Sequence, residues 1–295
     1  MKALYDVPAP AKLNLFLHIT GRRADGYHLL QSAFMLIDWC DTLHFEQRAD
    51  GLISREDLGA PLPEDDLTVR AARALQSVTH TTRGAHISIY KRLPAQAGMG
   101  GGSSDAASCL LALNRLWGLN LPLSALLPIG LKLGADVPFF LAGRNAWVEG
   151  IGEKITPIDL PPAQFVVVKP PQGLDTKLIF AAADLKRDTE TAILSGFAAN
   201  SGVGAYSFGT NDLQPVAQRL CPGVTQALQW LESQGLHGRM TGSGSAVFAQ
   251  ILQKIELKGL PETVSGRQPG GLQVKQCNNL DAHPLLGWAP SDDYR

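Results

Sequence analysis

A glycine-rich segment, PAQAGMGGGSSDAA at residues 94–107, restricts the possible folds of this 295-residue chain more than any other stretch. Upstream of it, apolar and polar residues alternate over 85–93, which predicts a strand. Downstream, apolar residues recur at helical spacing and predict a helix over 103–117, with Ser103 or Ser104 capping its first turn. The glycines therefore lie between a strand and the start of a helix.

This position favours a loop that binds an anion over a flexible joint between domains. The start of a helix has unpaired N–H groups and a partial positive charge, and glycine lets the backbone approach a ligand without a Cβ in the way. The usual nucleotide motifs fit poorly. Residues 98–103 lack the third glycine of G-x-G-x-x-G, and no lysine follows them as in G-x-x-x-x-G-K-[ST]. A nucleotide site here needs a lysine from elsewhere in the chain.

Composition limits the classes of partner. The 26 basic and 27 acidic residues give no broad basic field, so neither nucleic acid nor a membrane is expected as a partner. The four cysteines are isolated, without a C-x-x-C pair, and the histidines are not clustered, which argues against a zinc site and a disulfide framework. The sequence has neither an apolar run of about 18 residues nor a signal-peptide pattern. We therefore expect a cytoplasmic protein that recognises an anion locally.

The rest of the chain alternates strand and helix patterns and has no internal repeat. We expect strands at about 8–19 and 30–47, a helix at 66–78, the strand, loop and helix described above, a helix at 122–133, and strands at 144–158 and 164–169. Pro161 and Pro162 precede the last strand and mark the best candidate for a domain boundary. Residues 239–249 combine a glycine turn with an apolar run, which on its own favours a hairpin.

Three polar residues stand out beside these elements. In the first strand the odd positions are apolar, so Lys12 and Asn14 share the opposite face, about 7 Å apart, where they face either solvent or a cleft. Asp136 lies between Gly134, which can end a helix, and Pro138, and by itself it is explained as a turn aspartate that bonds its own backbone. From these residues alone, a purely structural role stays open for all three.

Tyr27 and His28 follow a charged loop bounded by Gly21 and Gly26. An aromatic ring and an imidazole in succession could stack on a nucleobase, although by themselves they are more typical of an exposed loop without a ligand. The local pattern leaves both interpretations open.

Taken together, these motifs resemble those of the galactokinase, homoserine kinase, mevalonate kinase and phosphomevalonate kinase (GHMP) superfamily. The matching segments, in chain order, are PAPAKLNL at 8–15, GYH at 26–28, PAQAGMGGGSSDAA at 94–107, LGADVPF at 133–139 and TGSG at 241–244. Within the superfamily, the set is most similar to the branch that acts on 4-diphosphocytidyl-2-C-methyl-D-erythritol. The resemblance extends from about Pro8 to Phe248.

The resemblance implies an α+β fold of two domains with the active site in the cleft between them: an ATP-binding, catalytic domain at 1–160 and a substrate-binding domain at 161–295. It implies an ATP-dependent small-molecule kinase that phosphorylates the 2-hydroxyl of this cytidine diphosphate-linked methylerythritol in non-mevalonate isoprenoid synthesis. ATP and Mg²⁺ are the expected cofactors, and no metal-ligating residue is predicted. Two alternatives stay open, a superfamily kinase for another small alcohol and a non-catalytic nucleotide-binding regulator.

The resemblance also implies a role for individual residues. Lys12 and Asp136 match the catalytic pair of the superfamily, so the lysine missing from the glycine loop would come from the first strand. The residues implied to bind ATP are Pro94, Ala95, Gln96, Ala97, Gly98, Met99, Gly100, Gly101, Gly102, Ser103 and Ser104. Those implied to bind substrate are Asn14, Tyr27, His28, Thr176, Phe180, Thr241, Gly242, Ser243 and Gly244. Tyr27 and Phe180 would enclose the cytosine, and His28 would hydrogen-bond to it. The segment 185–207 has no motif, and no role is predicted there.

Overall fold

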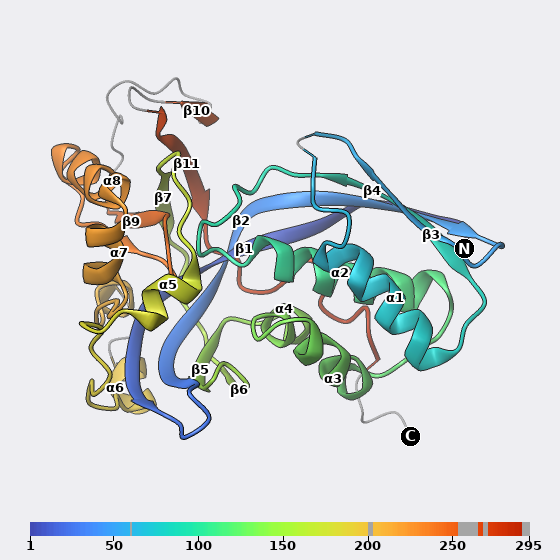
Figure 1. Ribbon diagram of the computed structural model, residues 1–295, viewed down its shortest axis with the longest axis horizontal. Helices are drawn as coiled ribbons and strands as arrows, with labels where there is room; N and C mark the ends of the chain where they lie inside the picture. Colours follow the sequence, from blue (N-terminus) through green and yellow to red (C-terminus); the bar gives the residue numbers. More distant parts are fainter. Residues whose placement is uncertain (60, 200–202, 253–264, 268–270, 291–295) are drawn as a thin grey trace.

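The computed structural model describes the chain except for residues 60, 200–202, 253–264, 268–270 and 291–295. Two β-sheets form the framework, and helices are grouped beside each of them (Figure 1). This arrangement confirms the predicted α+β class. Among the helices of the described residues, none combines the length and apolar character that a membrane crossing requires.

The first sheet has six strands in the order β3–β4–β2–β5–β6, with β1 paired to β2. They are β1 (Ala3–Arg22), β2 (His28–Arg48), β3 (Ile53–Asp57), β4 (Gly84–Tyr90), β5 (Ala146–Gly150) and β6 (Lys154–Pro157). Strand β2 is antiparallel to β1 along most of its length, and it also pairs with β5 at residues 30–34 and with β4 at 42–48. The long β2 strand therefore links the whole sheet.

Four helices lie on one side of this sheet (Figure 1). They are α1 (Leu67–Thr79), α2 (Gly101–Leu116), α3 (Leu123–Leu133) and α4 (Val137–Ala142). Helix α2 is the most deeply buried of the longer ones, and its alanines and leucines join residues of β1, β2 and β4 in one hydrophobic core. This packing holds the start of α2, and with it the glycine loop, beside β1.

The second sheet is antiparallel throughout, in the order β10–β11–β7–β9–β8. Its strands are β7 (Gln164–Lys169), β8 (Arg239–Met240), β9 (Val247–Ile251), β10 (Ser265–Arg267) and β11 (Gln273–Asn278). The helical segments around it are α5 (Thr176–Ala181), α6 (Leu194–Ala199), the 3₁₀ turn η1 (Val203–Tyr206), α7 (Gln214–Leu220) and α8 (Pro222–Ser233).

Strand β7 is apolar on both faces because each face is covered. Val166 and Val168 pack in the core that contains α7 and α8, whereas Phe165 and Val167 pack in the core between the two sheets. Successive side chains of a strand point to opposite faces. The uninterrupted apolar run at 165–168 follows from this double burial.

Each sheet and the helices beside it form one unit, and the two units also exchange segments. Near the end of β1, Leu17 and Ile19 pack in the core of the second unit. In the other direction, residues 279–290 return to the first unit, drawn in red in Figure 1, and Leu285 is buried in its core. A boundary between residues 160 and 161 separates the strands of the first sheet from those of the second. That 1–160 and 161–295 are separate domains remains a prediction.

Two local predictions can be compared with the structure. The prediction that Ser103 or Ser104 caps the helix is wrong, because α2 begins at Gly101 and its N-cap is Gly100, in the left-handed region (φ 70°) and without a side-chain cap. Glycine adopts this backbone conformation without the strain of a Cβ, which is why the helix starts earlier than the serines suggest. The hairpin expected at 239–249 is present as the antiparallel pair β8 and β9.

Candidate active site

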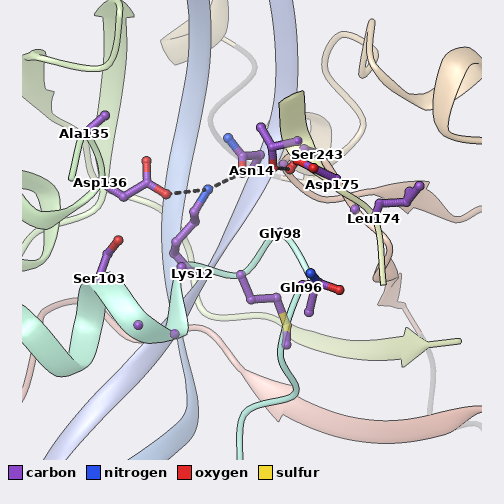
Figure 2. A pocket seen from close by; sticks show the side chains of 18 of the residues that line it. Lys12, Asn14, Gln96, Gly98, Ser103, Ala135, Asp136, Leu174, Asp175 and Ser243 are labelled. Atoms are coloured by element: carbon purple, nitrogen blue, oxygen red, sulfur yellow. Dashed lines mark hydrogen bonds and ion pairs between the residues drawn. The ribbon is translucent and has the colours of Figure 1, made fainter. Parts of the chain in front are cut away.

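A cavity of about 1110 Å³ is lined by residues of both units. Figure 2 shows Lys12 near its centre, with Ser103 and Asp136 on one side and Asn14 and Ser243 on the other. Of the predicted site residues, all of which are described, Ser104 and Thr241 do not line the cavity, and the others do. The cavity therefore brings together segments that are far apart in the sequence, from Lys12 in β1 to Gly244 in the turn after β8.

The glycine loop reaches this cavity through close backbone contacts. Gly98 has φ 73°, and a Cβ there would lie 2.3 Å from the Thr241 carbonyl oxygen. A Cβ on Gly100 would lie 2.9 Å from a ring carbon of Phe140. The loop is thus packed between other elements, which excludes the flexible-joint interpretation. Because no side chain caps α2, its first N–H groups remain available to an anion.

Lys12 projects from β1 into the cavity wall and is only 3% exposed, which excludes the solvent-facing interpretation. Its ammonium donates to Asn14 Oδ1 at 2.5 Å and lies 4.3 Å from the centroid of the Phe34 ring. Burial lowers the pKa of Lys12, and the carboxylate of Asp136 partly opposes that shift. The Lys12 backbone N–H donates to the Met99 carbonyl at 3.0 Å, which joins β1 directly to the glycine loop.

Asp136 precedes α4 and makes no side-chain capping bond. The interpretation of Asp136 as a turn aspartate that hydrogen-bonds to its own backbone is therefore wrong. Its Oδ2 instead lies 3.6 Å from Lys12 Nζ, and its side chain is 32% exposed, so the carboxylate is accessible from the cavity. An accessible carboxylate and a buried ammonium now lie side by side, next to the start of α2.

The far end of the cavity is lined by aromatic and hydroxyl side chains. The rings of His28 and Phe180 have centroids 5.0 Å apart, and Tyr27 beside them is 61% exposed. Thr176, at the start of α5, and Ser243 share a hydrogen bond of 2.6 Å. This end offers the exposed ring of Tyr27, the half-buried rings of His28 and Phe180 and two hydroxyl groups, which together suit a flat heterocycle.

The two predicted residues that do not line the cavity, Ser104 and Thr241, are both fully buried. The Oγ1 of Thr241 accepts a hydrogen bond of 2.9 Å from the Asn14 backbone N–H. The Oγ of Ser104 has no hydrogen-bond partner among the described residues. Thr241 therefore ties the second unit to β1 rather than facing a ligand.

The sequence did not predict a buried cluster of charged side chains, Lys91, Asp41 and Asp105, that lies beneath the glycine loop. Lys91, at the end of β4, binds Asp41 and also donates to Asp105 Oδ2 at 2.6 Å. Asp41 Oδ1 in turn accepts from the backbone N–H groups of Arg92 and Leu93, at 2.6 and 2.8 Å. Lys91 and Asp105 flank the loop in sequence, which was a usable signal, whereas nothing in the sequence connects Asp41 to them.

The charges of this cluster are interdependent. Burial works against the ammonium of Lys91, but Asp105 and Asp41 outweigh that effect and raise its pKa. Burial, together with the neighbouring Asp41, holds the pKa of Asp105 well above its usual range. The cluster joins β2 and the end of β4 to Asp105 in the second turn of α2, so it fixes both ends of the glycine loop.

The arrangement can carry out chemistry on a phosphorylated ligand. Free amides at a helix start and an adjacent ammonium stabilise negative charge, and a nearby carboxylate can accept a hydrogen bond from a hydroxyl. All three lie on one wall of a cavity that is large enough for two small ligands. The geometry suits the transfer of a phosphoryl group to an alcohol.

Comparison with known proteins also indicates a kinase that acts on a small molecule. The profile of the GHMP kinases N terminal domain matches residues 66–144, and that of the GHMP kinases C terminal domain matches 190–255. The chain is 68% identical to the 4-diphosphocytidyl-2-C-methyl-D-erythritol kinase of Albidiferax ferrireducens (strain ATCC BAA-621 / DSM 15236 / T118), over 99% of this chain and 98% of that protein. It is 67% identical to the enzyme of the same name from Variovorax paradoxus (strain S110), over 98% of this chain and 100% of the other.

Solved structures agree at the level of the fold. A crystal structure of 4-(cytidine 5'-diphospho)-2C-methyl-D-erythritol kinase superimposes with a TM-score of 0.73 at 36% identity, covering 83% of this chain and 89% of the other. A mevalonate kinase structure superimposes with a TM-score of 0.64 at 13% identity, covering 94% of this chain and 99% of the other, which shows the shared fold alone.

Proposed function

The chain belongs to the 4-diphosphocytidyl-2-C-methyl-D-erythritol kinase family of the GHMP superfamily, and from this premise we propose how its cavity performs the reaction. The reaction is the ATP-dependent phosphorylation of the 2-hydroxyl of 4-diphosphocytidyl-2-C-methyl-D-erythritol, a step of isoprenoid precursor synthesis. The observation that supports the assignment of roles is the Lys12–Asp136 pair beside the uncapped start of α2.

ATP binds with its phosphates against the glycine loop in this proposal. The N–H groups of the loop and of the first turn of α2 would donate hydrogen bonds to the phosphate oxygens, and the ammonium of Lys12 would add positive charge beside them. Asp136 accepts the hydrogen bond of the substrate 2-hydroxyl and so orients its oxygen toward the γ-phosphorus. Little covalent help from the protein is needed, because phosphoryl transfer depends mainly on positioning and on charge stabilisation.

Mg²⁺ belongs to the proposal as a companion of ATP. The described part of the chain contains no group of three or more His, Cys, Asp or Glu side chains that could hold an ion by itself. This fits Mg²⁺, which keeps several waters and is usually held by one or two protein oxygens together with the phosphates. The Ser103 hydroxyl and the Asp136 carboxylate would supply those oxygens. The ion would screen the phosphate charge.

The cytidyl end of the substrate lies against Tyr27, His28 and Phe180 in this arrangement, and Thr176 and Ser243 supply hydroxyl groups. Stacking of a base on an aromatic ring contributes about 1–3 kcal/mol and suits the exposed ring of Tyr27. The domain boundary near residue 160 remains part of the proposal. A cytoplasmic location is also part of it, supported by the four unpaired cysteines, all of which lie in the described residues.

The test is ADP release by the purified protein with the cytidyl substrate, with mevalonate, homoserine and galactose in parallel. We expect ADP release with the cytidyl substrate and none with mevalonate, homoserine or galactose. Turnover with one of the other alcohols instead would assign the chain to another activity of the superfamily. ATP binding without ADP release in any reaction would support a non-catalytic nucleotide-binding protein.

A further inference from the structure

His28, in the cavity wall, is held by an arginine that no sequence motif indicates. Arg187 lies in the segment between α5 and α6, and its Nε donates to His28 Nε2 at 3.1 Å. A guanidinium has no acceptor, so the ring nitrogen that it contacts must be unprotonated. A neutral imidazole carries one ring proton, and this contact therefore places that proton on Nδ1.

The arginine is itself fixed from several sides. Its Nη1 donates to the Leu185 carbonyl at 2.9 Å, and its Nη2 donates to the carbonyls of Phe180 and Ala182 at 3.3 and 2.7 Å. Two residues further on, the backbone N–H of Thr189 donates to the Ile19 carbonyl at 3.0 Å, which anchors the segment on β1. The guanidinium thus binds the imidazole and the end of α5 at once, and it cannot turn away without losing these bonds.

The surroundings also keep the imidazole neutral. Burial lowers the pKa of His28, and the charges of Arg187 and Arg22 lower it further. Arg22 donates to the Gly26 carbonyl and not to the ring, so it affects the charge of His28 but not the position of its proton. Among the described residues, none hydrogen-bonds to Nδ1 of His28, and its N–H remains available to a ligand in the cavity.

We propose that Arg187 is a positioning residue for base recognition: it fixes the His28 tautomer so that Nδ1–H is presented as a donor to N3 of a cytosine. The proposal rests on the cytidyl substrate assigned above. Cytosine has an acceptor at N3, whereas uracil has an N–H there. The same tautomer would place two donors against each other in a uridyl analogue, and a site built around a hydrogen bond rejects a ligand that cannot complete it. Arg187 thereby sets the preference for cytosine without touching the base.

The first experiment measures the tautomer in the free protein by two-bond ¹⁵N–¹H correlation of the imidazole rings. We expect wild-type His28 to carry its proton on Nδ1, and we expect Arg187→Ala to redistribute it between both nitrogens. Arg219→Ala is the matched control, because Arg219 binds the exposed carboxylate of Asp184 in the same region, and it should leave the His28 signals unchanged. A wild-type proton on Nε2 overturns the inference, whatever the activity of the enzyme.

The second experiment compares kcat/KM for the cytidyl substrate and its uridyl analogue. We expect Arg187→Ala to lower the cytidyl-to-uridyl ratio by about 10-fold or more, mainly through KM for the cytidyl substrate, while KM for ATP stays unchanged. Arg187→Lys should not restore the ratio, because a lysine cannot bind the ring and the α5 carbonyls together. Arg219→Ala should keep the wild-type ratio.

The outcomes separate this inference from the proposed function. An unchanged ratio in folded Arg187→Ala, or full restoration by lysine, overturns the role of Arg187 and leaves the kinase assignment standing. Equal kcat/KM values of the wild type for the two substrates also overturn it. Failure of the wild type to turn over the cytidyl substrate refutes the proposed function instead, and the tautomer measurement remains a test of the Arg187–His28 contact itself.

Discussion

Charged side chains are rarely buried unless they have partners, and Lys12 shows how such partners hold a buried charge in a functional site. It is 3% exposed, and its ammonium is balanced by Asp136, by the amide oxygen of Asn14 and by the Phe34 ring. Burial also removes rotamer freedom, so the charge has a fixed position before any ligand arrives. At this scale, the site is built from a few groups whose surroundings hold them in one orientation and one charge state.

Replacement of Asp136 by asparagine tests the role of the carboxylate. Asp136→Asn keeps the shape of the side chain but removes the charge, so kcat should fall by about 100-fold or more. The affinity for ATP measured without Mg²⁺ should change little, because the glycine loop and Lys12 are retained. Steady-state kinetics and calorimetry measure the two effects. The control is Asp184→Asn, which removes an exposed carboxylate paired with Arg219. Near-normal turnover by folded Asp136→Asn would show that this carboxylate is not needed for catalysis.

His283 gives the stability of the fold a dependence on pH. Burial lowers its pKa to about 4, and its Nδ1 accepts a hydrogen bond of 3.1 Å from the Leu285 backbone N–H. The unfolded chain, with an ordinary histidine pKa of about 6.5, takes up a proton that the folded protein does not. The free energy of unfolding should therefore fall as the pH drops from about 6.5 to about 4.

The variant His283→Asn separates this contribution from that of the carboxylates. Asparagine can keep an acceptor for the Leu285 N–H, but it does not titrate. Urea unfolding at about pH 7 and about pH 4.5 should therefore show a smaller loss of stability in the variant than in the wild type. Equal losses in both proteins would mean that His283 is not the group responsible.

At the scale of elements, the glycine loop and α2 function as one unit. The loop ends in a left-handed glycine, the helix begins without a side-chain cap, and the Lys91–Asp41–Asp105 cluster ties the helix to β2 and β4. The amides that would face phosphate are therefore held by packing and by buried charges rather than by a capping side chain. A change in backbone conformation here should affect ligand binding more than a change in side-chain chemistry.

Two alanine substitutions in the same loop test this view. Gly100→Ala introduces a Cβ at φ 70°, 2.9 Å from the Phe140 ring, whereas a Cβ on Gly102 meets only Leu67 Cδ1 at 3.5 Å, an ordinary contact. Gly100→Ala should cost about 1–3 kcal/mol of unfolding free energy and weaken ATP binding about 10-fold. Gly102→Ala should keep the wild-type stability. Urea unfolding and calorimetry measure both, and equal stabilities of the two variants would contradict the argument.

At the scale of the whole molecule, the cavity exists because two units meet along β1. The first half of this strand packs beneath α2, while Leu17 and Ile19 pack in the second unit. Thr241, from the turn after β8, reaches across and accepts the Asn14 N–H. A Cβ on Gly242 would lie 2.6 Å from the Gly98 carbonyl oxygen, so the turn and the glycine loop touch through their backbones. The two units are thus joined at the wall of the site.

Thr241→Val tests the importance of this contact. Valine has almost the same shape, but it leaves the buried N–H of Asn14 without an acceptor, which should cost about 1–3 kcal/mol of unfolding free energy. Thr79→Val is the control, because the Thr79 hydroxyl donates only to the Leu75 carbonyl within α1. Urea unfolding of both variants measures the difference. A loss in Thr241→Val no larger than that in Thr79→Val would show that the contact between units contributes little.

The sequence by itself determined the elements and the main features of the site. Alternation and helical spacing predicted β1, β2, β4, α1, α2 and α3 close to their observed positions, because these periods are properties of the local backbone. The same geometry placed Lys12 and Asn14 on one face of β1. The structure confirms this shared face and adds a hydrogen bond between the two side chains, which was not predicted. The superfamily resemblance implied the pairing of Lys12 with Asp136, which the residues alone left open.

The tertiary structure decided which groups face the ligand and which support it. The connection of Lys91 and Asp105 to Asp41, the burial of Thr241, and the contact of Arg187 with His28 join segments that no local pattern relates. Each depends on how the strands pair and how the two units pack, and therefore on the summed interactions of many residues. A capping serine at 103 or 104 was a sound local expectation, yet packing of α2 against the first sheet and a left-handed Gly100 started the helix earlier. Local periodicity follows from bonds between neighbours in the chain, whereas long-range contacts follow from the free energy of the whole fold.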